Sequence, residues 1–316
     1  MADSELAVRI IFGIIAFVGA VINCFIFHLL MKVKLGSRST MTLLCNQCLF
    51  DALSCLIAIL TNVTGPVVHT ANLTFNAIMC YLWSYGSFLS ISVVLSMHNL
   101  ICISVDRLFA TFCPIGYKQR QKWLIVCSYI YLLLIVLVLC VPFFFNRRYQ
   151  NELCLWEYAT DDPNLPIVSS IHSYIWLVFE YVLPALLTGG LHALIVWKLL
   201  RNRKQACVSP QSDDQTEVQM RRLVGTTVLY CLVCALFQLP DALAYLFERM
   251  QIGSYDPGSV MHQARLMSIT IAYCVNPCIL ILLNRPLREL ATQQFVMCAT
   301  CPHLKWQKAA GKRAET

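Results

Sequence analysis

The sequence predicts an all-α membrane protein, a seven-transmembrane helix bundle with a short amphipathic eighth helix. Composition is the first reason, because hydrophobic residues make up 58% of the 316 residues and charged residues only 13%. Soluble domains have roughly 45–50% apolar and about 25% charged residues. The second reason is that the apolar residues gather in seven long runs. Each run reaches the length of about 20 residues that a helix needs to cross a bilayer.

The elements follow from these runs in chain order. The expected spans are 6–31, 41–68, 77–105, 123–145, 167–200, 223–247 and 259–283. Strands of a membrane barrel would be about ten residues long and alternating, so the runs favour helices. The first run is too long for a signal-peptide core and lacks a basic leader. We expect an extracellular segment 1–5, a seven-helix domain 6–283, an eighth helix 284–301 and a cytoplasmic tail 302–316.

The basic residues predict the orientation. Of the 24 Lys and Arg residues, 19 lie in the connections on one side of the expected bundle. Basic residues near spans mark the cytoplasmic side, so we expect an extracellular N-terminus in a multi-pass plasma-membrane protein. The net charge of +7 is therefore a topology signal, and it indicates contact with membrane lipid and not with nucleic acid. Most of the 17 cysteines lie inside the apolar runs, so they do not form a secreted disulfide framework.

Polar motifs recur at the ends and centres of these spans. They are Asn23 in the first, Asn46 and Asp51 in the second, Asp106-Arg107 at the end of the third, Pro184 in the fifth, Pro240 in the sixth and Asn276-Pro277 in the seventh. In this order they resemble the motifs of rhodopsin-like (class A) G-protein-coupled receptors, over about residues 6–301. Leu280, His192 and Gln238 depart from the residues that this family uses in activation.

The resemblance implies a receptor, with no catalytic chemistry, that transmits binding of an extracellular ligand to a heterotrimeric G protein. Asp106 and Arg107 would form the switch with Asn276 and Pro277, and Ile115 would insert into the G protein. Cys80 and Cys154 would form the disulfide between the third span and the second outer loop. Asn72 begins a glycosylation sequon, and Cys298 and Cys301 are candidate palmitoylation sites.

Charges inside the spans indicate where function lies, since each costs about 2.5–3.5 kcal/mol at the bilayer centre. Asp51 is the deepest. By resemblance, Ser96 and Asn276 surround it where the family binds sodium, and oxygen-bearing side chains suit such a hard cation. The alternative is a hydrogen-bonded polar core without an ion, and no other cofactor is expected.

The outer half contains two acids, Glu180 and Asp241, and the base Arg265. By resemblance both acids face the ligand cavity and suggest a cationic small molecule, such as an amine, or a peptide. Arg265 can satisfy one acid, which leaves one over, and we slightly favour Asp241 as the free acid. An internal ion pair is the alternative. The expected aromatic ligand contacts are Tyr85, Tyr181, Trp176 and Tyr245.

Other classes of function stay open at this point. A membrane transporter or channel would show paired repeats, broken helices or a charge-lined pore, and the sequence shows none. An intramembrane enzyme would need paired catalytic groups at one depth. A receptor fold with impaired signalling is a further alternative because of Leu280, His192 and Gln238.

Overall fold

The computed structural model describes most of the chain between residues 2 and 296. Outside the described residues lie Met1, Lys34, Pro66, His69, Asn146 and the segments 157–164, 207–213, 251–258 and 297–316. Seven of the described helices are long and apolar enough to cross a membrane: Leu6–Leu30, Arg38–Thr64, Leu73–Phe112, Pro114–Pro142, Ile171–Arg201, Arg221–Ala244 and Val260–Leu283.

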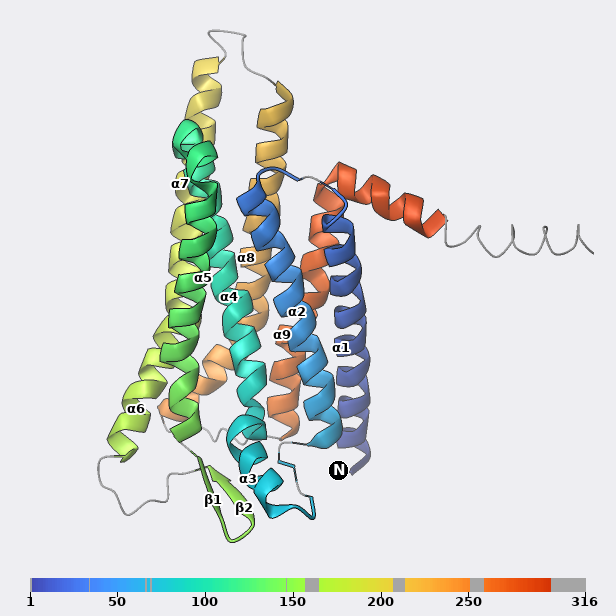
Figure 1. Cartoon of the computed structure of the whole chain (residues 1–316), viewed down its shortest axis with the longest axis vertical. Coiled ribbons are helices and arrows are strands. Elements are labelled where there is room, and N and C mark those ends of the chain that lie inside the picture. The colour runs from blue at the N-terminus through green and yellow to red at the C-terminus, as the bar shows by residue number, and fades with distance from the viewer. Residues whose placement is uncertain are drawn as a thin grey trace, which may run out of the picture.

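The helices form an elongated bundle with a small strand pair at one end (Figure 1). In chain order the elements are α1 (Ala2–Leu30), α2 (Arg38–Thr64), α3 (Leu73–Leu82), the 3-10 turn η1 (Ser84–Gly86), α4 (Ser87–Phe112), α5 (Pro114–Phe145), β1 (Arg147–Gln150), β2 (Leu153–Trp156), α6 (Leu165–Trp176), the π-helical segment η2 (Leu177–Val182), α7 (Leu183–Ala206), α8 (Asp214–Arg249) and α9 (Val260–Leu283).

Helix α1 begins at Ala2, so residues 2–5 continue the first helix and do not form a separate segment. After α9, residues 285–296 are helical and run sideways from the bundle (Figure 1). This agrees with the expected eighth helix over most of its length, and its last residues lie outside the described part. We call the end with β1 and β2 the hairpin end, and the end with residues 285–296 the tail end.

The third expected span is interrupted near the hairpin end. Helix α3 ends at Leu82, and α4 starts after Gly86, whose φ of 78° lies in the left-handed region. Glycine adopts this conformation without the steric cost of a Cβ. The apolar run 77–105 predicts one continuous helix here, because hydropathy alone does not register a backbone break.

A second difference is the antiparallel pair of β1 and β2, in which Tyr149 pairs with Cys154. The two residues of the turn, Asn151 and Glu152, both have positive φ. Such turns match the twist of the two strands that they join. The bundle is therefore helical in its spans, with one short hairpin added at its end.

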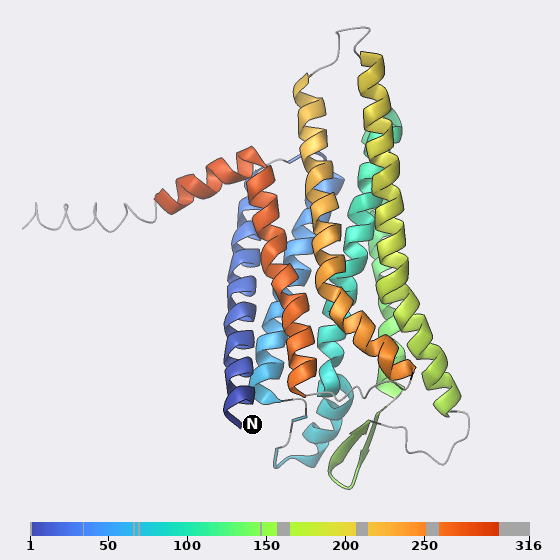
Figure 2. The ribbon, with the colours of Figure 1, turned by 180° about the vertical axis from the view of Figure 1, so that it is seen from behind.

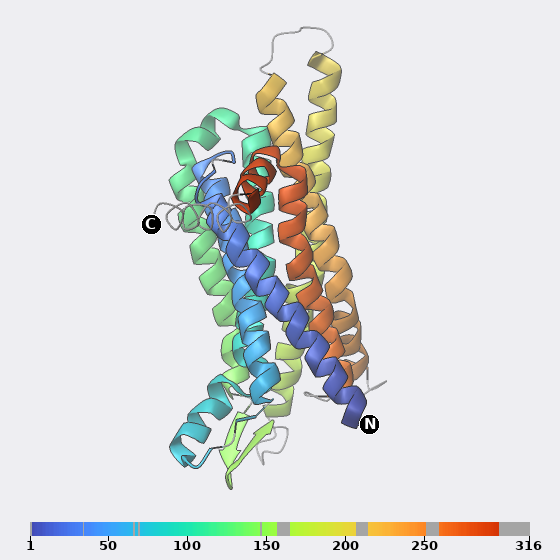
Figure 3. The ribbon, with the colours of Figure 1, turned by 90° about the vertical axis from the view of Figure 1, so that its right-hand side faces the viewer.

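Helix α4 lies at the centre of the bundle. It contacts α2, α5, α7 and α8, while α1 packs against α2 and α9. Figure 3 shows α1 crossing the bundle obliquely. The main apolar core joins α1, α2, α4, α5, α8 and α9 through fully buried side chains that include Leu29, Leu43, Leu100 and Leu280. Outward-facing residues such as Phe17 and Leu133 are exposed and apolar, as a lipid-facing surface requires.

Helices α8 and α9 each contain an internal proline, Pro240 and Pro277. Proline removes a backbone hydrogen bond and bends a helix. Helix α8 changes direction in its hairpin-end third (Figure 2), the part of the helix that contains Pro240. The π-helical segment η2 widens the backbone just before α7. These irregular turns lie beside the charged residues of the hairpin-end half.

Candidate functional site

The hairpin-end half holds a pair of opposite charges between α8 and α9. The Nε of Arg265 lies 3.5 Å from Oδ1 of Asp241, and the two side chains are only 8% and 12% exposed. The hydroxyl of Tyr181 on η2 donates a hydrogen bond to Oδ2 of the same carboxylate, at 2.7 Å. Three elements therefore meet at Asp241, and the predicted proximity of Arg265 to one acid is confirmed.

Glu180 occupies a different environment, although it is the chain neighbour of Tyr181. It is 1% exposed, and neither carboxylate oxygen accepts a hydrogen bond from the described part of the chain. Its neighbour is His98 on α4, whose Nε2 lies 3.9 Å from Oε2. The Nδ1 of His98 in turn bonds to the hydroxyl of Tyr131 on α5 at 2.7 Å. The slight preference for Asp241 as the free acid is therefore wrong, because Arg265 and Tyr181 engage it.

The expected aromatic contacts differ in their surroundings. Tyr181 bonds to Asp241, as described. Trp176 is buried in an apolar cluster with Val94 and Leu139, and its ring lies 6.4 Å from that of His172. Its surroundings in the described structure are therefore packing contacts. The backbones of Tyr85 and Tyr245 lie in η1 and α8, and their side chains lie outside the described residues.

The centre of the bundle holds a polar network around Asp51, which is fully buried. The Ser96 hydroxyl donates to Oδ1 of Asp51, and Nδ2 of Asn276 lies 3.4 Å from Oδ2. The expected grouping of these three residues is thus present. Gln47 joins them, because its Nε2 donates to Oδ1 of Asp51 at 2.9 Å.

Gln47 determines whether this network fits the sodium ion that the family resemblance implies. A hard cation binds oxygen lone pairs, but Gln47 and Asn276 both present N–H groups to the Asp51 carboxylate. This donor set does not fit a cation in the observed arrangement.

The tail-end site is built around Asp106 and Arg107 of α4. Nη2 of Arg107 donates to Oδ2 of Asp106, and both residues are buried. The same carboxylate accepts hydrogen bonds from Thr40 on α2 and Tyr117 on α5, each at 2.9 Å. Asp106 therefore ties α2, α4 and α5 together while it holds Arg107.

Three further residues complete the description of the tail end. His192 on α7 is within 3.1 Å of the Ser104 hydroxyl through Nε2, so it links α7 to α4. Ile115 is 78% exposed at the start of α5, and it is free to contact another molecule. Pro277 lies buried within α9, directly after Asn276.

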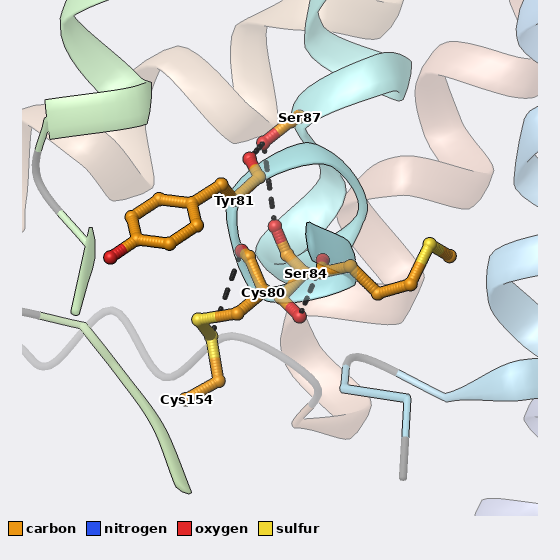
Figure 4. Close-up of a disulfide and its surroundings, with 6 residues drawn as sticks. Cys80, Tyr81, Ser84, Ser87 and Cys154 are labelled. Atoms are coloured by element: carbon orange, nitrogen blue, oxygen red, sulfur yellow. Dashed lines mark hydrogen bonds between the residues drawn. A yellow bond between two sulfur atoms is a disulfide. The ribbon is translucent and has the colours of Figure 1, made fainter. Parts of the chain in front are cut away.

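The predicted disulfide is confirmed. Cys80 of α3 is bonded to Cys154 of β2, with their Cα atoms 5.4 Å apart, and Figure 4 shows the bond joining helix and hairpin. Asn72 is exposed and caps α3 by accepting a hydrogen bond from Phe75 N. Its glycosylation stays a prediction. Cys298 and Cys301 lie outside the described residues.

Several members of these networks were not among the residues predicted from the sequence. Gln47 precedes Asp51 by one helical turn, a spacing that places two side chains on the same face, and this signal could have identified it. His98 and Tyr117 gave a weaker signal, because their partners Glu180 and Asp106 lie on other turns or other helices. Only the folded structure brings such pairs together.

The fold and these three polar sites match one class of membrane protein. The family model of seven-transmembrane receptors of the rhodopsin family matches residues 22–280. The chain belongs to this family, whose members are signalling receptors that pass an extracellular signal to a G protein and are not enzymes. It is a multi-pass plasma-membrane protein.

Its curated relatives include receptors of two kinds. Bombesin receptor subtype-3 of Ovis aries is 23% identical over 306 residues, which cover 92% of this chain and 75% of that receptor. Galanin receptor type 1 of Homo sapiens is 25% identical over 301 residues, with 90% and 80% covered. Galanin receptor 2a of Danio rerio is 22% identical over 291 residues, with 89% and 76% covered.

Proposed function

We propose that this receptor responds to an extracellular peptide that carries a basic group, and that the hairpin end faces the outside of the cell. The relatives named above are receptors for bombesin and galanin, which favours a peptide over a small amine. Two observations support the orientation. The excess of Lys and Arg lies toward the tail end, as on cytoplasmic sides, and the Cys80–Cys154 disulfide at the hairpin end suits an oxidising compartment.

The proposal of a basic group on the ligand rests on the hydrogen bonding of Glu180. Its two buried oxygens accept no hydrogen bond within the described part of the chain, whereas Asp241 has Arg265 and Tyr181. A buried carboxylate is costly unless it is neutralised or paired. His98 lies 3.9 Å away, beyond hydrogen-bond distance, and a cationic group on the ligand would supply the missing hydrogen-bond donor.

The backbone offers a route from this acid to the rest of the bundle. Glu180 and Tyr181 are consecutive in η2, and Tyr181 bonds to Asp241 on α8. A ligand group that binds Glu180 and shifts η2 would therefore also change the Tyr181–Asp241 contact between η2 and α8. The ligand shifts the population of states by its different affinity for each state. At the tail end, a G protein would dock beside Arg107 and the exposed Ile115.

A peptide screen in cells tests this proposal. Peptides with and without a Lys or Arg are applied to cells that express the receptor and a G-protein reporter. For an active basic peptide, Glu180→Gln should lower potency about 10- to 100-fold, since a hydrogen bond to a charged group is worth roughly 1.5–3 kcal/mol. The matched control is Glu152→Gln, an exposed acid in the hairpin turn, which should leave potency unchanged.

A second variant separates binding from signalling. Arg107→Ala should abolish the reporter response and leave binding of a labelled peptide in place. The proposal is wrong if every active peptide is neutral. It is also wrong if the potency of an active basic peptide is unchanged in both Glu180→Gln and Asp241→Asn.

A further inference from the structure

Besides Asn276 of α9, the polar network at Asp51 contains four hydrogen-bonded side chains from two neighbouring helices. Gln47 and Asp51 come from α2, and Ser96 and Asn99 come from α4. All four are buried, with exposures of 2% or less. Their hydrogen bonds form a continuous series from Asn99 through Gln47 to Ser96 and Asp51.

The direction of this series is fixed at its start. Nδ2 of Asn99 donates to the backbone carbonyl of Leu43 at 3.0 Å and to Oε1 of Gln47 at 2.9 Å. A carbonyl oxygen can only accept hydrogen bonds, so Asn99 must turn its NH2 group toward Leu43 and Gln47. Gln47 must then turn its oxygen toward Asn99.

The NH2 group of Gln47 consequently faces the carboxylate. Its Nε2 lies 2.9 Å from Oδ1 of Asp51 and 2.7 Å from Oγ of Ser96. Two N–H groups on one nitrogen satisfy two acceptors at once, and Ser96 adds its own hydroxyl to Oδ1. The orientation of this amide rests on the chemistry of its neighbours, because a reversed amide would set its oxygen against the Asp51 carboxylate and its NH2 group against the NH2 group of Asn99.

An N–H group directed at a carboxylate stands where a cation would have to bind. A hard cation needs oxygen lone pairs and is repelled by the positive end of an N–H dipole. Gln47 is also one helical turn from Asp51 on the same face. Because Gln47 is part of the chain, its amide stays in the site, whereas a bound ion could exchange with solvent.

We propose that the carboxamide of Gln47 takes the place of a cation at Asp51, so that this receptor's core is closed by an internal hydrogen-bond donor and does not respond to sodium. Gln47 is then the residue that sets the ion response. Removing its side-chain amide would leave Asp51, Ser96 and Oδ1 of Asn276, which has no hydrogen-bond partner within the described part of the chain. These are the oxygen ligands that a hard cation prefers.

The test uses the purified full-length receptor without any ligand, so it does not depend on the proposed peptide function. Thermal unfolding is measured in sodium chloride and in choline chloride at equal ionic strength, about 0.15 M. The wild type should unfold at the same temperature in both salts. The variant Gln47→Leu should unfold at a higher temperature in sodium, with an increase that saturates as a binding site does. Adding Asp51→Asn to that variant should remove the increase.

Each alternative outcome contradicts the proposal. A wild type that sodium stabilises, with the effect lost in Asp51→Asn, would mean that Gln47 yields its place to the ion. If Gln47→Leu unfolds at the same temperature in sodium chloride and in choline chloride, Gln47 does not determine whether the receptor binds sodium. Gln47→Met, which keeps an unbranched side chain, serves if the Leu variant does not fold, and the wild-type comparison alone can refute the proposal.

Discussion

The guanidinium group of Arg265 on α9 lies 3.5 Å from the carboxylate of Asp241 on α8. This pair joins two helices at the level where Tyr181 of η2 reaches the same carboxylate. It therefore ties η2 and α9 to α8, the longest of the described helices.

Removing one partner of this pair should destabilise the receptor. Arg265→Gln leaves the Asp241 charge buried without its cation, a change that costs about 3–5 kcal/mol when a buried pair is broken. The double variant with Asp241→Asn should regain most of the loss. Thermal unfolding of the purified variants measures both. As a control, Arg285→Gln breaks an exposed pair with Glu289, and surface pairs contribute little. Equal losses in the single and double variants would contradict the pairing.

A second prediction concerns Gly19 on α1. A Cβ at this position would lie 2.7 Å from Sγ of Cys55 and 3.0 Å from Sγ of Cys274, so α1 approaches α2 and α9 closely. Gly19→Ala should lower stability by roughly 1–3 kcal/mol, the usual cost of overpacking. Cys55→Ala should restore part of it. Gly190→Ala, where no atom lies within 4 Å, is the matched control, and a loss there as large as at Gly19 would overturn the packing explanation.

A third prediction concerns the disulfide. The bond closes a separation of 74 residues, which the loop-entropy model values at about 4 kcal/mol. Replacing both Cys80 and Cys154 by Ser should sharply reduce the amount of receptor at the cell surface, measured by labelling intact cells. The exposed free thiol of Cys127 provides the control, since Cys127→Ser should reach the surface normally. Normal surface levels in the double variant would refute the prediction.

A fourth prediction concerns the tail-end switch. Tyr117→Phe removes one hydrogen bond to Asp106, worth about 0.5–1.5 kcal/mol, and so weakens the group that holds Arg107. Ligand-free G-protein activation should rise roughly 2- to 10-fold, because each 1.4 kcal/mol changes a population ratio about tenfold. Tyr129→Phe, which loses only an exposed bond to Asn46, should leave basal activity unchanged. No rise in Tyr117→Phe would mean that Asp106 does not restrain the resting state through this contact.

A fifth prediction distinguishes two glycosylation sequons at the hairpin end, Asn62-Val63-Thr64 and Asn72-Leu73-Thr74. The Asn62 amide of α2 donates to the backbone carbonyl of Arg9 in α1 at 2.8 Å, whereas Asn72 is exposed. A glycan should therefore be attached at Asn72. The shift in electrophoretic mobility after deglycosylation should disappear in Asn72→Gln and persist in Asn62→Gln, and the reverse pattern would contradict the choice of Asn72 as the site.

The spans could be predicted from the sequence because lipid imposes one strong requirement, namely a long apolar run. The expected seventh span 259–283 and the observed α9, Val260–Leu283, differ by one residue. The break at Gly86 and the π-helical turn around Glu180 were not predictable in this way. They depend on backbone angles, which hydropathy does not record.

The polar sites were predictable where the resemblance supplied the positions, as for Asp51 with Asn276. Those two residues are 225 positions apart, and no periodicity connects them. Gln47 and His98 were not predicted as site residues. A polar side chain within an apolar helical run does not by itself reveal which partner it binds. The spacing of Gln47 from Asp51 offered a sequence signal, whereas the partner of His98 is brought to it only by the fold.

Helix α8 also has a mechanical consequence. It has 36 residues and contains Pro240 toward its hairpin end, and together with α7 it extends beyond the other spans at the tail end (Figure 1). The distance from Pro240 to the start of the helix is roughly 40 Å, at about 1.5 Å per residue. A pivot of only ~10° at the proline would swing that far end by about 7 Å. Helix α8 would then act as a lever with its pivot at Pro240, directly beside Asp241, and under the proposed function a small rotation there would open space at the tail end for a G protein.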